Sequence, residues 1–293
     1  MRRLRSRSGP CYSLDLQLSC NWFFPLLLLS ATALPAAEAP YYVTYSAQME
    51  EPGNLEVSLD QLAGGNFLSS ILELEYGVKT WWTTEFYLDG QATGGQSALF
   101  TGWRIENRFR PWMGEHRINP VLYVEFEDIN GAEKSLKEVV GHDVADDQLV
   151  PNDEARRDHQ RELETKLILS SNVRGWDISA NLIAEKNLAA EPWEFGYAFG
   201  ASRPLAFAAT PGPCTFCREN FSVGAEVFGG IGTWRQFGLP GTSHYLGPIL
   251  AWQLPSGAQL MVSPAFGLNG NSHAFLLRFT VSYEIGQVFR RRS

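Results

Sequence analysis

Apolar and polar residues alternate one by one over most of the chain after residue 53. In the segment 274–285, Leu277, Phe279 and Val281 fall on one parity, whereas Arg278 falls on the other with its polar neighbours. Side chains of a β-strand alternate between two faces, so this pattern predicts a strand with one apolar and one polar face. The same alternation predicts strands at 54–62, 72–78, 81–89, 101–110, 121–128, 162–169, 176–185, 194–202, 221–229, 245–253, 259–267 and 274–285.

The links between these strands alternate in length. Those at 79–80, 173–175 and 255–257 are short, whereas the link at 129–160 is the longest. Short turns at one end and longer loops at the other are typical of a transmembrane β-barrel. An even strand count places both chain ends on the short-turn side, which is the periplasmic side of an outer-membrane barrel. The link at 203–219 breaks the rule, because it is long and falls on that side.

Alternation also fits a soluble lipocalin-like barrel or a β-sandwich, in which the apolar face would point inward. Three observations favour an apolar face that meets lipid. The polar parity is densely charged, tryptophan and tyrosine recur near strand ends, and twelve strands exceed the roughly eight that side chains can fill in a soluble barrel. The predicted fold class is therefore all-β, a transmembrane antiparallel up-and-down β-barrel of about 12 strands.

The first 39 residues are predicted to be a signal peptide. Several arginines precede the apolar run 22–34, and small residues follow at 35–39. We expect cleavage between residues 33 and 39; an N-terminal anchor helix is the alternative, although the run is short for a membrane span. Residues 40–293 then form the outer-membrane barrel, with 129–160 as its long extracellular loop. This architecture predicts export through the periplasm to the bacterial outer membrane.

Two stretches carry a resemblance to known proteins: "EPGNLEVSL" (51–59) and "LELEYGVKTWWTTEF" (72–86). They resemble bacterial outer-membrane β-barrel proteins, particularly the porin-like or transporter-like group associated with MetA-type phenol-degradation pathways. The resemblance covers roughly 51–289. It implies contact with membrane lipid and lipopolysaccharide, assembly by the barrel-assembly machinery, and a small-molecule solute whose identity the sequence leaves open.

The polar parity of the strands would line the lumen of such a barrel. We interpret it as a hydrated path with an acidic field that favours cations or amine-bearing solutes. The alternative is a set of paired charges that fills a narrow barrel, because buried charges must be paired or hydrated. The acids outnumber the bases, so pairing cannot be complete. The charged residues expected to line the lumen are Glu73, Glu75, Glu85, Arg104, Glu106, Arg108, Glu125, Glu127, Glu164, Lys166, Asp177, Glu226, Arg278 and Glu284.

The motif "CTFC" places Cys214 and Cys217 three positions apart within the link 203–219. Such a pair could be a disulfide, a redox pair or half of a metal site. The strand count puts it on the periplasmic side, where thiols oxidise. We therefore expect a local disulfide that pins this link.

No other motif points to chemistry. The acidic stretch 141–154 does not match an EF-hand loop, and the histidines show no zinc-binding spacing. We predict no catalytic residue, metal or cofactor, and the net charge of −8 makes nucleic acid an unsuitable partner. The leading hypothesis is a porin-like channel or transporter for small solutes through an acid-rich lumen, not an enzyme. The alternatives are a structural or interaction barrel with a closed lumen, an outer-membrane enzyme, and a soluble periplasmic β-protein.

Overall fold

The computed structural model describes residues 39–134, 150–189, 192–208 and 214–288. All of the predicted signal peptide except residue 39, and most of the acidic stretch 141–154, lie outside these residues. Within them, the only helical elements are α3 (Asn152–Ala155) and the 3₁₀ turn η1 (Arg218–Asn220), and no helix there is long and apolar enough to cross a bilayer.

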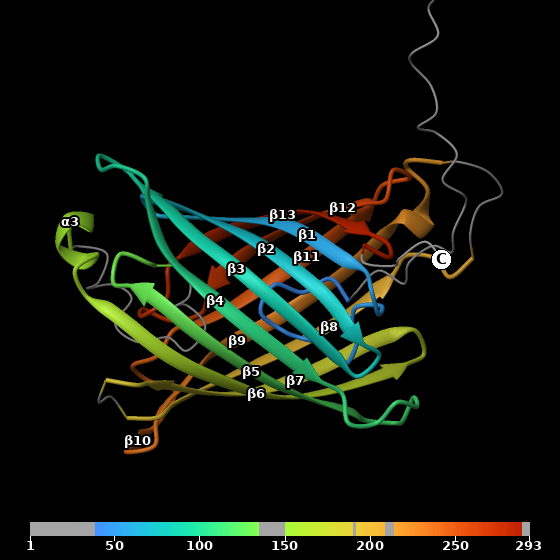
Figure 1. Cartoon of the computed structure of the whole chain (residues 1–293), viewed down its shortest axis with the longest axis horizontal. Coiled ribbons are helices and arrows are strands. Elements are labelled where there is room, and N and C mark those ends of the chain that lie inside the picture. Colours follow the sequence, from blue (N-terminus) through green and yellow to red (C-terminus); the bar gives the residue numbers. More distant parts are fainter. Residues whose placement is uncertain (1–38, 135–149, 190–191, 209–213, 289–293) are drawn as a thin grey trace, which may run out of the picture. The chain divides into compact units, whose positions relative to one another are not determined.

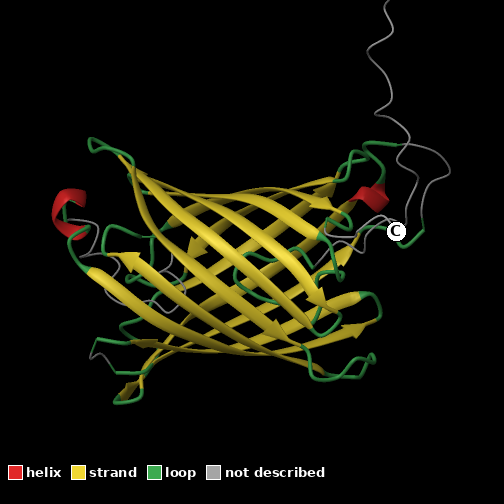
Figure 2. Ribbon diagram, in the orientation of Figure 1, coloured by secondary structure: helices red, strands yellow, loops and turns green. Residues whose placement is uncertain are grey.

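Antiparallel strands make up most of the described chain (Figure 2). Each of the twelve predicted strands is present within a few residues of its expected bounds. The strands are β1 (Leu55–Gly64), β2 (Phe67–Lys79), β3 (Trp82–Thr93), β4 (Leu99–Phe109), β5 (Asn119–Asn130), β6 (His159–Val173), β7 (Trp176–Asn187), β8 (Glu194–Pro204), β9 (Phe221–Thr233), β10 (Gln236–Phe237), β11 (His244–Gln253), β12 (Ala258–Gly267) and β13 (Phe275–Ile285).

The sheet closes on itself. Each long strand pairs with its neighbours in sequence, and β13 pairs with β1 from Leu55↔Ile285 to Gly64↔Leu276. β9 bonds both β8 and β11, so twelve strands form a closed antiparallel barrel, and the short β10 extends the end of β9 (Figure 1). The predicted fold class is confirmed, with one extra strand that the alternation did not reveal.

Local chemistry explains the tight connections. The turn between β6 and β7 is made by Arg174 and Gly175, which have φ angles of 53° and 79°. Two consecutive residues with positive φ form the type of hairpin turn whose twist matches that of paired strands, and glycine adopts this conformation without steric cost.

Two prolines lie opposite each other in β11 and β12. The pairing between these strands stops after Leu246↔Phe266 and resumes at Leu250↔Val262, on either side of Pro248 and Pro264. Proline lacks an N–H group and cannot donate to the ladder. Both strands still pair with their other neighbours along this stretch, which keeps the barrel closed.

The apolar parity points away from the barrel interior. On β5, the Leu122 and Val124 side chains are 52% and 40% exposed, whereas Glu125 is 1% exposed. The same inversion recurs around the barrel, with leucine, isoleucine and phenylalanine outside and charged residues inside. An outer surface of this kind is favourable in hydrocarbon, where closure of the sheet also removes the unpaired edges that an open sheet would expose.

A charge on this outer face is expected to destabilise the barrel. Val124→Arg should lower the free energy of unfolding in a bilayer by about 2–4 kcal/mol, since arginine near the membrane midplane loses its hydration. Ile118→Arg, an exposed position in the β4–β5 turn, is the matched control and should cost about 0–1 kcal/mol. Urea titration of the liposome-folded protein, followed by tryptophan fluorescence, measures both; equal stabilities would place Val124 outside the hydrocarbon.

Candidate functional site: the interior of the barrel

The interior of the barrel holds a part of the chain that precedes the first strand. We call residues 39–50 the N-terminal segment; its dark-blue trace runs among the strands in Figure 1. Val43, Thr44 and Ala47 of this segment are buried, although none of them belongs to a strand. The strands begin only at Leu55, so the first part of the predicted barrel region lies inside the wall and does not build it.

A carboxylate on β9 holds the centre of the segment. Glu226 Oε2 accepts hydrogen bonds from the backbone N–H groups of Val43 at 3.0 Å and Thr44 at 3.1 Å. Its other oxygen accepts from Arg278 Nη1 at 3.0 Å. Backbone groups of an irregular segment need partners when they are buried, and charge-assisted bonds to a paired carboxylate are among the stronger ones.

Two further contacts fix the segment against β7. Asn181 Oδ1 accepts from the Tyr45 backbone N–H at 2.6 Å, and Asn181 Nδ2 donates to the Tyr45 carbonyl at 2.9 Å. The Tyr41 hydroxyl donates to Asp177 Oδ1 at 2.9 Å. Burial raises the pKa of the Tyr41 phenol well above its usual value, so the hydroxyl keeps the proton that it donates.

The wall under the segment is made of small residues. On β8, Gly196, Ala198 and Gly200 are buried and occupy the positions of the strand that face the lumen. A Cβ atom at Gly200 would lie 2.4 Å from Cε1 of Tyr41, so only glycine leaves room for the ring. Glycine inside a strand often marks such a close approach.

A cavity of about 460 Å³ lies between the N-terminal segment and the strands of the opposite wall. Carboxylates dominate its lining over cationic groups. The acids are Glu56, Asp60, Glu73, Glu75, Glu85, Glu125, Glu127, Glu162, Glu164, Glu185 and Glu194, and the bases are Arg104, Arg108, Lys166 and Arg278. The bases cannot neutralise all of these acids by simple pairing, which leaves the cavity with a negative field unless protons or solute cations enter.

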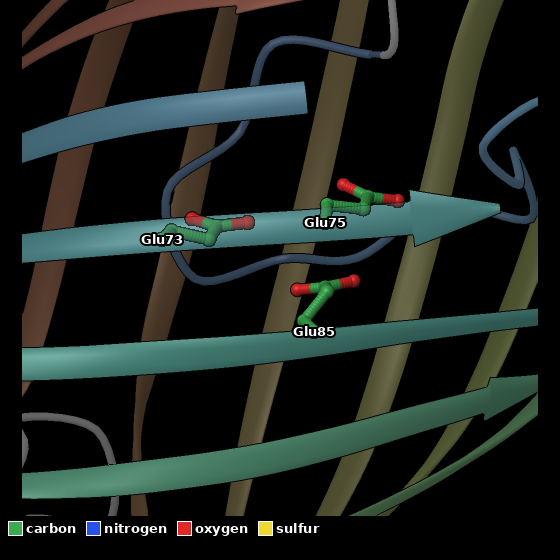
Figure 3. Close-up of side chains that lie close together, drawn as sticks. All are labelled: Glu73, Glu75 and Glu85. Carbon is green, nitrogen blue, oxygen red and sulfur yellow. The ribbon is translucent and has the colours of Figure 1, made fainter. Parts of the chain in front are cut away.

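Arg108 is the centre of one group of ion pairs. Its guanidinium contacts the carboxylates of Glu75 and Glu85, and its Nε lies 3.3 Å from Glu106 Oε1. Figure 3 shows Glu73 and Glu75 on β2 beside Glu85 on β3, three carboxylates whose oxygens lie within 4.8 Å of one another. A metal ion could use such a group, but the guanidinium of Arg108 already forms ion pairs with two of its members, Glu75 and Glu85.

The other bases of the cavity also have acidic partners. Arg104 lies 3.2 Å from both Asp89 and Glu125, and Lys166 Nζ lies 2.7 Å from Glu164. With Arg278 bound to Glu226, each of the four lining bases is in an ion pair within the described part of the chain. The acids that remain are therefore not balanced by these bases.

The structure brings most of the residues predicted to line the lumen together at the cavity. Glu106 instead accepts from the Tyr45 hydroxyl at 3.0 Å, Asp177 and Glu226 hold the N-terminal segment, and Glu284 accepts from Asn54 near the start of β1. That these residues form a solute path stays a prediction. Those at the cavity are Glu73, Glu75, Glu85, Arg104, Arg108, Glu125, Glu127, Glu164, Lys166 and Arg278.

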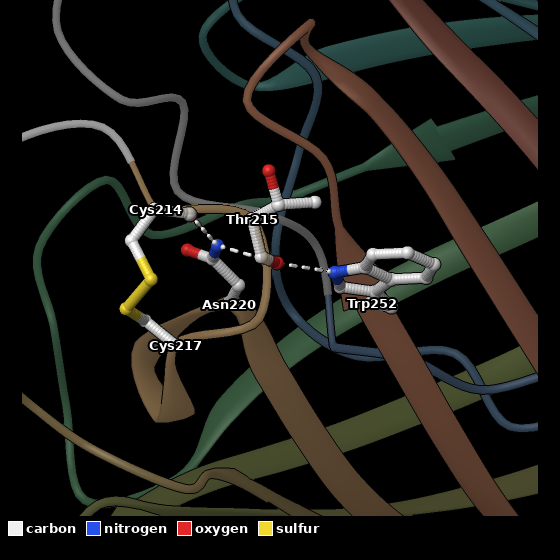
Figure 4. The surroundings of a disulfide bond; sticks show 5 residues. All are labelled: Cys214, Thr215, Cys217, Asn220 and Trp252. Carbon is white, nitrogen blue, oxygen red and sulfur yellow. Dashed lines mark hydrogen bonds between the residues drawn. A yellow bond between two sulfur atoms is a disulfide. The ribbon is translucent and has the colours of Figure 1, made fainter.

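Cys214 and Cys217, the candidate pair in the long link before β9, form a disulfide (Figure 4). Asn220 Nδ2 donates to the Cys214 carbonyl at 2.6 Å and to the Thr215 carbonyl at 3.2 Å. The Trp252 indole N–H, at the end of β11, donates to the same Thr215 carbonyl at 2.9 Å. The disulfide-bonded turn is thus fixed to the end of the barrel at which β1 begins and β13 ends.

The role of the N-terminal segment was missed from the sequence. Two signals could have found it. The run "YYVTYSAQME" (41–50) is too aromatic for an exposed linker, and Gly196 and Gly200 occupy positions of the inward parity without any polar side chain. Together they indicate a buried strip of chain and the groove that receives it.

No known protein family matches the chain, and no curated protein sequence matches it. In structure it is similar to the COG4313 outer-membrane channel from Pseudomonas putida F1, with a TM-score of 0.53 and 12% identity over 84% of this chain and 99% of that one. It is also similar to the KdgM porin and the NanC porin, with TM-scores of 0.48 and 0.47, identities of 7% and 6%, and coverage of 78% of this chain and 98% and 97% of theirs. At 12% identity the likeness to the COG4313 channel shows the fold alone. The narrower resemblance to the MetA-type group stays a prediction.

Release of the N-terminal segment can be tested at Gly200. Gly200→Val puts branched carbons where the Tyr41 ring lies, and overpacking of this kind costs about 1–3 kcal/mol. Amides of Val43, Thr44 and Tyr45 should then exchange with deuterium about tenfold faster or more, because their protection depends on the docked segment. Hydrogen exchange with mass spectrometry measures this in detergent.

Gly90→Val is the control for this experiment, because a Cβ atom at Gly90 meets no atom closer than 3.5 Å. Exchange in the N-terminal segment should be unchanged in that variant. Slow exchange in both variants would show that Tyr41 does not fix the segment.

Proposed function

We propose that the protein is an outer-membrane channel for small solutes, with a path through the acid-lined lumen that the N-terminal segment narrows. The observation that carries the proposal is the cavity of about 460 Å³ inside a closed barrel, whose lining holds eleven acids and four bases. In this setting the protein contacts membrane lipid and lipopolysaccharide on its apolar outer face and is folded by the barrel-assembly machinery.

The charge of the lining supports a preference for cations. Arg104, Arg108, Lys166 and Arg278 are each held by carboxylates, so they offer little attraction to an anion. The acids in excess of these pairs attract cations and amine-bearing solutes, as rings of acidic side chains do in cation channels.

One observation favours the second candidate, a structural or interaction barrel with a closed lumen. Val43 of the N-terminal segment packs into a cluster of buried apolar side chains that come from β1, β2, β7, β8, β9, β11, β12 and β13. An apolar layer of this kind resists hydration and conducts ions poorly. Its members are Val43, Leu62, Phe67, Ile183, Ala198, Phe228, Tyr245, Ala265 and Leu276.

Single-channel recording in planar bilayers separates the two functions. We expect small, steady conductances with a reversal potential on the cation-selective side in a KCl gradient, because the lining is acidic. Gly200→Val should raise the conductance, since the displaced segment then occupies less of the lumen, whereas Gly90→Val should not. Silence of both the wild type and Gly200→Val, in preparations whose gel migration is heat-modifiable, would favour the closed barrel.

A further inference from the structure

The long link before β9 carries aromatic side chains that lie against the outer rim of the barrel. Phe216, within the disulfide-bonded turn, stacks on Trp252 with ring centres 4.9 Å apart. Trp252 in turn stacks on Phe221, the first residue of β9, at 5.7 Å. Trp252 shares the outward parity of β11 with Leu250, which is 42% exposed. The link therefore extends the apolar outer surface at the end of the barrel where β1 begins.

An arginine and two more aromatic rings form a second contact of the same link. Ser202 and Asp177 are a register pair of β8 and β7 on the inward parity, so the adjacent position of each strand faces outward. Those positions, at the rim, are Arg203 and Trp176. The guanidinium carbon of Arg203 lies 5.3 Å from the centre of the Trp176 ring and 5.1 Å from that of Phe207. Both distances suit cation–π contacts, which hold the guanidinium beside two exposed rings.

Arg203 has no counter-charge on the chain. Its Nε donates to the Pro204 carbonyl at 3.4 Å, and within the described residues it forms no ion pair and no other hydrogen bond. The bases that line the cavity all have carboxylate partners. An arginine on the lipid-facing side of a membrane protein reaches for the headgroup level, because its charge is costly in hydrocarbon. The two Nη groups of Arg203 are therefore available to an acceptor from outside the chain.

Two further arginines lie along the same stretch of rim. Arg174 is in the β6–β7 turn beside Gly175, where a Cβ atom would overlap the Phe207 ring, so the link packs against this turn. Arg218 Nη2 donates to the Leu205 carbonyl at 3.4 Å. Both arginines are exposed. They add positive charge on either side of the contact between the link and the strand ends.

Acids are scarce at this rim. Glu219 is the only acid in the stretches 170–176 and 203–221, against three arginines. The next acid along the chain, Asp177, accepts from the Tyr41 hydroxyl inside the barrel. A positively charged surface with exposed aromatic rings at a membrane interface is typical of the recognition of anionic lipid headgroups.

We propose that this rim binds an anionic phospholipid, with Arg203 donating to the phosphate and the rings of Trp176 and Phe207 lying along the acyl chains below it. The phosphate supplies the acceptors and the negative charge that the guanidinium lacks, and the planar fork of arginine matches two phosphate oxygens. Arg174 and Arg218 favour an anionic headgroup over a zwitterionic one. The strand count predicts that this end faces the periplasm, on which side the outer membrane presents phospholipids.

Native mass spectrometry of the purified protein, released from detergent micelles that contain lipid, tests the site. The probes are palmitoyl-oleoyl phosphatidylglycerol, the zwitterionic phosphatidylcholine with the same acyl chains, and inorganic phosphate. We expect phosphatidylglycerol to be retained with about tenfold higher affinity than phosphatidylcholine, because the rim is positively charged. Equal retention of the two lipids overturns the proposal, as does displacement of phosphatidylglycerol by inorganic phosphate, which would make this a site for a free anion.

Two variants localise the site. Arg203→Gln should weaken phosphatidylglycerol binding about tenfold, to the level of phosphatidylcholine, since it removes the group that donates to the phosphate. Arg235→Gln is the matched control, because Arg235 also lies over a tryptophan ring, 5.4 Å from the centre of Trp234, but at the opposite end of β9. Its binding should be unchanged. Equal losses in the two variants, or no loss in Arg203→Gln, would mean unspecific attraction and overturn the site.

Two further observations keep the test independent. Heat-modifiable gel migration confirms that each variant is a folded barrel, and the comparison of the two lipids on the wild type needs no variant. The rim lies on the outer face, so lipid binding and conductance through the lumen are measured separately and either proposal can fail without the other.

Discussion

Backbone hydrogen bonding in hydrocarbon is the constraint on which the rest of this structure depends. Each N–H or C=O group that lacks a partner in the membrane core costs several kilocalories per mole, so a sheet can span a bilayer only when its edges meet. The pairing of β1 with β13 meets this condition and forces every second side chain into an enclosed space. The interior is acidic because most of the charged residues at the inward-facing positions are glutamate or aspartate.

Closure also explains why two opposed prolines are tolerated. Pro248 and Pro264 interrupt the ladder between β11 and β12, but the neighbouring strands β9 and β13 continue to pair with them on their other sides. In an open sheet, a strand with a proline tends to be an edge strand. In a closed barrel no edge exists, and the interruption stays local.

The period-two alternation was enough to predict the twelve strands of the barrel wall and the parity that faces outward, but not the short β10. Each residue of a barrel strand faces either the lumen or the outside, so an alternating pattern separates the two environments. Even the weaker proline-containing segments 245–253 and 259–267 were predicted correctly in position.

The contents of the lumen could not be predicted in the same way. Which acid meets which base depends on the shear of the sheet, which brings Arg108 to Glu75 two strands away. The docking of residues 39–50 depends on Asn181 and Glu226, which lie more than a hundred positions later in the chain.

This separation in sequence has a consequence for the order of folding. The groups that hold the N-terminal segment lie on β7 and β9, and Arg278, which fixes Glu226, lies on β13, so the docking site of the segment is complete only when the last strand is in place. During assembly the interior of the barrel is therefore an unoccupied, wet and strongly charged space. We expect the segment to dock late, and its docking narrows the space that the closed barrel encloses.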